Sequence, residues 1–211
     1  MIISYLGHSC FKLRGTKTIV VTDPYDREVF SKAMPRTKAD IVTISHFHHD
    51  HCAVDRVAGS PFVINGPGEY EIKGISIFGT SSFHDKVQGA KRGKNTIYVY
   101  NIDDLRLSHL GDLGCKLTEK QIEQVSGIDI LMIPVGGVYT INAKEAVAVI
   151  EQLEPKIIIP MHYKTKDLSF ELKPIDEFLE EMGKKEIEPV KDLKITKATL
   201  PEEIEVVWLK K

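Results

Sequence analysis

The chain has 211 residues, of which 42% are hydrophobic and 27% are charged. These proportions are ordinary for a globular protein and the length suffices for a substantial core, so we expect a single domain over residues 1–211. The formal net charge of −2 offers no overall attraction to nucleic acid or to an anionic membrane, which argues against both as partners.

Short strands dominate the first half of the chain. Apolar and β-branched runs predict strands over residues 2–6, 10–13, 18–22, 41–45 and 61–64. Two more strands, over residues 69–72 and 75–78, flank Lys73-Gly74, a dipeptide that favours a hairpin turn. This half therefore supplies most of one β-sheet and the start of another.

The second half alternates strands with helices. The pattern predicts strands over residues 96–102, 105–108, 128–135 and 157–160, and a final edge strand over 203–209. Thr118 and Gln121 form a candidate capping box for a helix that ends near Val125. Asn142 is placed to cap a helix over residues 143–153, and a short helix follows over 174–182. We therefore predict an α/β fold without repeats or linkers.

The N-terminus and the cysteines indicate a cytoplasmic protein. Residues 1–8 lack the basic and apolar segments of a secretion signal, and no apolar run approaches the length of a membrane-spanning helix. The three cysteines, Cys10, Cys52 and Cys115, have no CxxC spacing, and an odd number argues against a disulfide framework. We therefore expect a cytoplasmic protein with no membrane partner.

The most informative segment is His46-Phe47-His48-His49-Asp50-His51, which directly follows the strand predicted over residues 41–45. If the chain is still extended at His46, then His46 and His48 share one face, because side chains alternate across a strand. Asp50 and His51 then fall where the chain turns, and residues 52–57 are available to open a helix. Ligands that point two ways are hard to gather around one ion, so we predict two adjacent ions.

Three further candidate ligands, His84, Asp112 and His162, each follow a later strand-like run. The carboxyl ends of strands in α/β folds meet along one edge of a sheet, where these residues would complete the site. Each residue alone has a structural alternative: a turn at His84, an Asx turn at Asp112 and a core histidine at His162. Beside a histidine-rich loop that would be costly to bury without a cation, we interpret all three as metal ligands. Imidazole and carboxylate together suit zinc, and also manganese or iron.

Three other polar residues have open roles. Asp23 is either a residue of the turn before Pro24 or a carboxylate that orients a ligand imidazole. His8 and His109 could each orient a ligand, donate a proton or serve structure alone.

Taken together, these residues resemble the metallo-β-lactamase superfamily, and specifically its small single-domain hydrolases related to ascorbate-6-phosphate lactonases. The family pattern is an early Asp, then HxHxDH, a later His, an Asp and a final His. This chain has that order as Asp23, residues 46–51, His84, Asp112 and His162. Further local matches lie at residues 6–11, 109–112 and 134–140, and the resemblance extends to about residue 163.

The resemblance implies a four-layer αβ/βα sandwich of two mixed β-sheets with outer helices and a metal site along one edge. It assigns the ligands as follows: one ion to His46, His48 and His84, the other to Asp50, His51 and His162, with Asp112 bridging the two. Dizinc β-lactamases carry a cysteine in place of Asp112 and are secreted, which argues against antibiotic hydrolysis. The spacing between ligands also leaves little room for the inserted domains or arms of RNA-cleaving relatives.

We therefore expect a hydrolase in which a hydroxide held by two divalent ions attacks a small ester, lactone or phosphodiester. Asp50 would orient the nucleophile, and His109, Tyr139 or a metal-bound water would protonate the leaving group. The loop after His84 carries four cationic residues, Lys86, Lys91, Arg92 and Lys94. This loop is either solvated or lies over the metals and attracts an anionic substrate.

Two other functions stay open. One is a phosphodiesterase or nuclease that acts on short nucleic acid, which the near-neutral charge disfavours. The other is a non-catalytic metal-binding module that kept the fold, which the intact ligand set disfavours.

Overall fold

Two β-sheets form the framework of the computed structural model, which describes residues 1–30 and 34–211. The first sheet has the strand order β14-β1-β2-β3-β5-β7. Its strands are β1 (Ile2–Gly7), β2 (Cys10–Arg14), β3 (Ile19–Thr22), β5 (Ile41–Thr43), β7 (Phe62–Ile64) and β14 (Asp192–Lys194). Two short strands, β4 (Thr37–Lys38) and β6 (Val57–Ala58), pair separately with each other.

The second sheet has the strand order β15-β13-β12-β11-β10-β9-β8. Its strands are β8 (Gly68–Ile72), β9 (Ile75–Phe83), β10 (Lys94–Ile102), β11 (Leu105–His109), β12 (Ile130–Pro134), β13 (Ile157–Met161) and β15 (Glu205–Val206). Strands β8 to β11 are antiparallel, whereas β11, β12, β13 and β15 run parallel, so the sheet is mixed.

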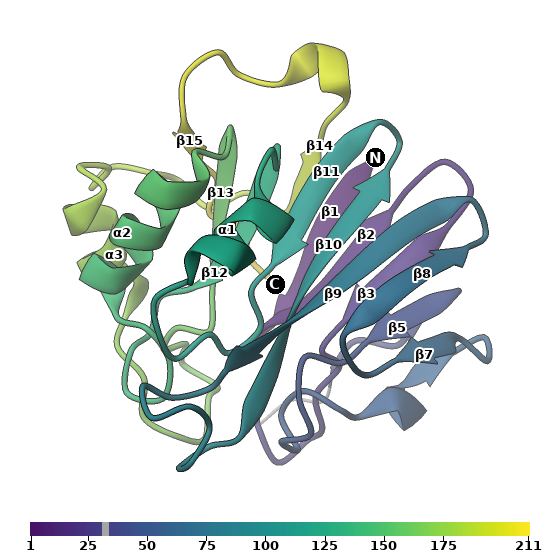
Figure 1. Cartoon of the computed structure of the whole chain (residues 1–211), viewed down its shortest axis with the longest axis horizontal. Coiled ribbons are helices and arrows are strands. Elements are labelled where there is room, and N and C mark those ends of the chain that lie inside the picture. The colour runs from purple at the N-terminus through teal and green to yellow at the C-terminus, as the bar shows by residue number, and fades with distance from the viewer. Residues whose placement is uncertain (31–33) are drawn as a thin grey trace.

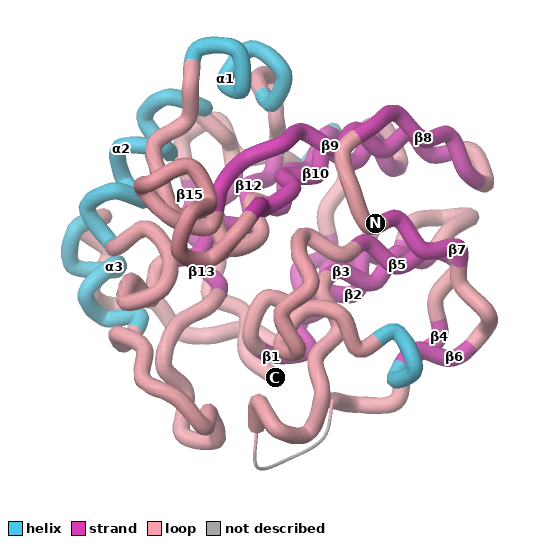
Figure 2. Tube along the Cα trace, turned by 60° about the horizontal axis from the view of Figure 1, so that its bottom comes forward, coloured by secondary structure: helices cyan, strands magenta, loops and turns pink. Residues whose placement is uncertain are grey.

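The α-helices of the described residues cover the outer face of the second sheet. They are α1 (Glu119–Val125), α2 (Ala143–Leu153) and α3 (Ile175–Glu181), and Figures 1 and 2 show them together beside β12 and β13. Asn142 caps α2 through a capping box with Glu145, and Thr118 caps α1 through a capping box with Gln121, as the sequence predicts. None of these helices has the length and apolar composition that crossing a bilayer requires.

The inner faces of both sheets contribute to one hydrophobic core. Ile130 and Met132 of β12 belong to this inner core, whereas Leu131 and Ile133 pack into a second core beneath the helices. This alternation is that of a strand buried on both faces, which explains the continuous apolar sequence of β12. The two mixed sheets packed through this core confirm the predicted fold class.

The outer face of the first sheet is covered differently from the expectation. A third apolar cluster there joins Tyr25, Val29 and Phe30 to Leu168 and Leu172, all outside regular helices. Residues 52–57, which the sequence left available to open a helix, instead form the 3₁₀ turn η1 (Val54–Arg56), and Val57 begins β6. A second 3₁₀ turn, η2 (Lys197–Thr199), lies near the C-terminus. Within the described residues, the outer α-helical layer therefore covers one sheet only.

Strand directions bring the candidate site together. In the first sheet, β1, β3 and β5 run the same way, because β2 is antiparallel to both of its neighbours and β3 is parallel to β5. In the second sheet, β9, β11, β12 and β13 share one direction. Next to the site, the backbone N–H of Thr96 on β10 donates to the carbonyl oxygen of Ser45 at 2.8 Å, which ties the two sheets together.

Candidate metal centre

The seven predicted ligands lie together where these strands end. Histidine and carboxylate atoms there form three overlapping groups, each with its ligand atoms within 4.8 Å of one another. The groups are His46, His48 and His84; His8, Asp50, His51 and His162; and His46, His51 and Asp112. The first sheet supplies the histidine-rich loop and His8, and the second sheet supplies His84, Asp112 and His162. The structure thus gathers every predicted ligand, while their role in binding metal stays a prediction.

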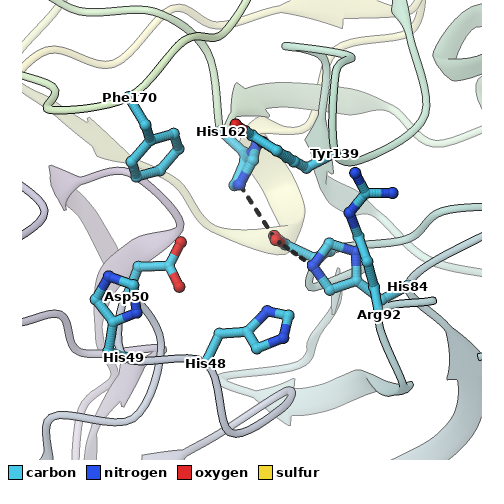
Figure 3. Close-up of a pocket in the computed structure, with 9 residues that line it drawn as sticks. His48, His49, Asp50, His84, Arg92, Tyr139, His162 and Phe170 are labelled. Carbon is cyan, nitrogen blue, oxygen red and sulfur yellow. Dashed lines mark ion pairs between the residues drawn. The ribbon is translucent and has the colours of Figure 1, made fainter.

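Asp112 lies at the centre of the cluster. Its Oδ2 atom is 3.1 Å from His84 Nε2, 3.1 Å from His162 Nε2, 3.3 Å from His51 Nε2 and 3.9 Å from His46 Nε2. Two of these ion pairs are drawn as dashed lines in Figure 3. A single carboxylate therefore contacts histidines of both sheets.

The turn that carries Asp112 is held by close backbone contacts. Asn95 Oδ1 accepts a hydrogen bond from the Asp112 N–H at 3.0 Å. Gly111 has a φ of +56°, and a Cβ there would lie 2.3 Å from Asn95 Oδ1. Only glycine fits this conformation and this space without displacing Asn95. Asn95, which the sequence did not single out, therefore positions the central carboxylate.

Asp23 orients the ring of His51. The atoms around His51 that lack hydrogen-bond partners then show whether the site fits a cation. His51 Nδ1 donates to Asp23 Oδ2 at 2.8 Å, and Asp23 also accepts from the N–H and hydroxyl of Ser45. A neutral His51 then presents the lone pair of Nε2 to Asp112 Oδ2 and to Asp50 Oδ2, at 3.3 Å and 3.5 Å. His51 Nε2 and Asp112 Oδ1 are buried and have no hydrogen-bond partner. A lone pair facing carboxylates fits a shared cation.

Burial and charge set the protonation of the cluster. Burial lowers the pKa of His46 to about 3, with His51 adding to the effect. Burial opposes ionisation of Asp112, but His162 and His51 hold the pKa of that carboxyl well below its usual range. Burial also opposes charge on His51, yet Asp112 and Asp50 hold its pKa well above the ordinary value. A protonated His51 thus balances the carboxylates, and a bound cation would release that proton.

Comparison with known proteins identifies the family. Residues 2–162 match the family model described as a beta-lactamase superfamily domain. A crystal structure of a candidate Zn-dependent hydrolase of the metallo-β-lactamase superfamily, from Thermotoga maritima, is 41% identical with a TM-score of 0.82, and the match covers 99% of this chain and 97% of that one. The chain belongs to the metallo-β-lactamase superfamily.

A curated relative and a second solved structure are also similar to this chain. A UPF0173 metal-dependent hydrolase from Thermoplasma volcanium is 29% identical over 194 residues, which cover 79% of this chain and 85% of the relative. The isothiocyanate hydrolase from Delia radicum gut bacteria has a TM-score of 0.73 over 93% of this chain and 100% of its own, but at 14% identity it shows the shared fold alone. The chain is a metal-dependent hydrolase of the metallo-β-lactamase superfamily, and its His/Asp cluster could hold metal.

His8, whose role the sequence left open, lies within the candidate metal centre. It follows β1 with a φ of +58°, is buried, and places Nε2 3.1 Å from Asp50 Oδ2. Its ring centroid lies 4.3 Å from that of His162. Burial, with His162 adding to the effect, lowers the pKa of His8 to about 4. His8 is therefore a neutral imidazole that can donate from Nε2 and fix the Asp50 carboxylate.

His109 lies apart from the cavity, although we considered it as a proton donor. Its Nε2 lies 2.8 Å from the carbonyl oxygen of Ser9, and its Nδ1 accepts from the N–H of Gly111 at 3.2 Å. Both ring nitrogens of this buried side chain thus bond to backbone, with the proton on Nε2. His109 therefore ties the Asp112 turn to the start of β2.

A cavity of about 380 Å³ opens beside the ligands (Figure 3). Its lining residues are His48, His49, Asp50, His84, Arg92, Asp112, Tyr139, His162 and Phe170. The rings of Tyr139 and Phe170 form one wall, with their centroids 5.8 Å apart. The predicted catalytic residues Asp50 and Tyr139 thus both border the cavity, while Phe170 is a lining residue that sequence patterns did not indicate.

Proposed function

We propose that this enzyme is a dinuclear hydrolase that cleaves a small ester, lactone or phosphodiester. The observation that supports the proposal best is the Asp112 carboxylate, whose Oδ2 lies 3.1 Å from both His84 and His162. A carboxylate shared by two groups of histidines is the donor that a pair of adjacent cations requires. His46, His48 and His84 would hold one ion, and Asp50, His51 and His162 the other.

The ions, zinc with manganese or iron as alternatives, would supply Lewis acidity and a hydroxide nucleophile at neutral pH. The side chains prepare the site for this chemistry. Asp23 fixes the His51 ring, so that Nε2 faces the other ligands. His8 fixes the Asp50 carboxylate, which borders the cavity where the substrate would bind.

We assign the leaving-group proton to Tyr139. Its ring borders the cavity, and its hydroxyl forms no hydrogen bond with any part of the chain that the structure describes. A phenol O–H can donate to the developing alkoxide, and no other neutral hydroxyl lines the cavity within those residues. His109 is less suited to this step, because both of its ring nitrogens bond to backbone.

Elemental analysis and a substrate panel test the proposal together. Protein purified without chelators should contain about two metal ions per chain, and Asp112→Asn should lower that number. His49→Gln is the matched control, because His49 lies within the same loop but outside the ligand groups. The loaded protein should turn over at least one ester, lactone or phosphodiester. Two bound ions with no turnover across the panel would instead support a non-catalytic metal-binding module.

A further inference from the structure

We propose that Arg92, held over the ring of Tyr139, is an anion-binding subsite that recognises a carboxylate or phosphate group of the substrate. The inference rests on the hydrolase proposed above and names the class of its substrate. Of the four cationic residues in the loop after His84, Arg92 alone lines the cavity. Its guanidinium carbon lies 5.2 Å from the centroid of the Tyr139 ring (Figure 3).

The guanidinium of Arg92 is available for a ligand. No carboxylate among residues 1–30 and 34–211 forms an ion pair with it. A cation–π contact with an aromatic ring restricts where a guanidinium can lie and leaves its N–H groups available for a ligand. These groups match the two oxygens of a carboxylate or phosphate, to which arginine binds in a bidentate manner. An arginine that lines a cavity, contacts an aromatic ring and has no carboxylate partner among the described residues is therefore a candidate recognition group.

The loop that carries Arg92 is fixed before any ligand binds. The buried carboxylate of Asp85 accepts hydrogen bonds from four backbone N–H groups, those of Val87, Gly89, Lys91 and Arg92, at 2.7 to 2.9 Å. The loop also closes on itself, since the N–H of Gly93 donates to the carbonyl oxygen of Gly89 at 2.9 Å. A loop ordered in advance loses little entropy on binding, which favours selective recognition.

The other three cationic residues of the loop lie on the exposed surface of the protein, outside the cavity lining. Lys86 pairs with Glu145 at the start of α2, away from the cavity lining. Lys91 and Lys94 are exposed and do not line the cavity. The sequence left two interpretations for this loop: a solvated surface, or a cationic loop over the metal site. The first interpretation fits Lys86, Lys91 and Lys94, and the second fits Arg92. Of these four cationic residues, Arg92 is the one placed to contact a substrate in the cavity.

The shape of the cavity adds a constraint on the substrate. The rings of Tyr139 and Phe170 provide an apolar wall beside Arg92, and the metal ligands His48 and His84 border the same space. A substrate that spans both features needs an apolar or cyclic body between its scissile bond and its anionic group. The cavity of about 380 Å³ suits a small metabolite-sized molecule.

Two chromogenic esters test the subsite by kinetics. They are 4-nitrophenyl acetate, which is neutral, and mono-4-nitrophenyl succinate, which carries an additional carboxymethyl group and with it a distal carboxylate. In zinc- or manganese-loaded protein, Arg92→Gln should lower kcat/KM for the succinate ester about 10-fold more than for the acetate ester, the usual effect of losing a charged hydrogen bond. Lys91→Gln, a cation of the same loop outside the cavity, should leave both values unchanged. Equal losses on both esters with Arg92→Gln, or no loss, would overturn the proposal.

Binding measurements keep the subsite testable if neither ester is hydrolysed, because that outcome concerns the proposed hydrolysis of esters and not the binding of an anion. Calorimetric titration of the loaded protein with benzoate and with phenylphosphonate distinguishes the two anions. For the recognised anion, Kd should rise about 10-fold in Arg92→Gln and stay constant in Lys91→Gln. Identical Kd values in all three proteins for both anions would rule out an anion subsite at Arg92.

Discussion

The carbonyl oxygen of His8 accepts a hydrogen bond from the backbone N–H of His162 at 3.0 Å. This contact joins the end of β1 in the first sheet to the end of β13 in the second, and both residues have positive φ angles, +58° and +52°. Each backbone therefore departs from the strand in a conformation that is uncommon for a residue with a side chain. The strained pair brings two imidazoles from opposite sheets into contact at the metal centre.

Replacing His8 tests its part in that centre. His8→Gln removes the imidazole that holds Asp50, so the affinity for metal should fall about 10- to 100-fold, as for other residues that orient a ligand. Titration with zinc against a competing chromogenic chelator measures this change. His49→Gln again serves as the control. Unchanged affinity in His8→Gln would show that Asp50 is held adequately without His8.

Removing the metal should lower thermal stability. A cation that binds only the folded chain stabilises it by about 3 to 4 kcal/mol when its concentration is 100 to 1,000 times Kd. Dialysis against a chelator should therefore lower Tm by several degrees, and added zinc should restore it. In Asp112→Asn, which loses the central carboxylate, Tm should respond less to zinc. An identical response in both proteins would place the stabilising ion elsewhere.

Gly111→Ala should disturb the turn that carries Asp112. The new Cβ would lie 2.3 Å from Asn95 Oδ1, in a conformation with φ of +56°. Gly127→Ala is the matched control, with φ of +70° but no atom within 4 Å of the added Cβ. Overpacking should make Gly111→Ala less stable than Gly127→Ala by about 1 to 3 kcal/mol in urea unfolding. Equal stability losses would mean that Asn95 and Ser45, which both lie within 3 Å of the added Cβ, move aside freely.

Tyr139→Phe separates the hydroxyl of Tyr139 from its ring. If the hydroxyl protonates the leaving group, kcat should fall about 100-fold for esters of poor leaving groups such as methanol. Esters of 4-nitrophenol need no such proton, so their kcat should change little. The phenyl ring still supports Arg92, so KM should be nearly constant. A similar loss with both kinds of ester would assign the hydroxyl another role.

The clustering of the ligands could be predicted from sequence because it follows from where strands of one direction end. His84, Asp112 and His162 each follow a strand, and strands of one direction end at one edge of a sheet. The edge strand β14 was missed, because Asp192–Lys194 is short, polar and largely exposed. The α-helix that residues 52–57 were available to open does not form, for a non-local reason. The N–H of Ala53 donates to the carbonyl oxygen of Pro24, and Val57 already pairs with β4.

The roles of individual polar residues could not be predicted in the same way. His8 and His109 have similar sequence settings, yet one contacts Asp50 and the other bonds only to backbone. Their difference comes from which segments pack against them after folding.

Similarly, nothing in the sequence of the basic loop separates Arg92 from Lys91. Side-chain direction there depends on the hydrogen bonds that Asp85 forms with the loop backbone.

Asp85 holds the backbone of the loop that carries Arg92 through hydrogen bonds made within the loop itself. Its carboxylate supplies the acceptors for the loop from within, and the loop leaves and rejoins the sheet between β9 and β10. We expect the tip of this segment to tolerate exchange while His84 keeps its place, provided that Asp85 and the hydrogen bond from the His84 N–H to the Gly93 carbonyl oxygen are retained. Enzyme engineers could graft alternative loops between Asp85 and Gly93 to redirect selectivity without rebuilding the catalyst.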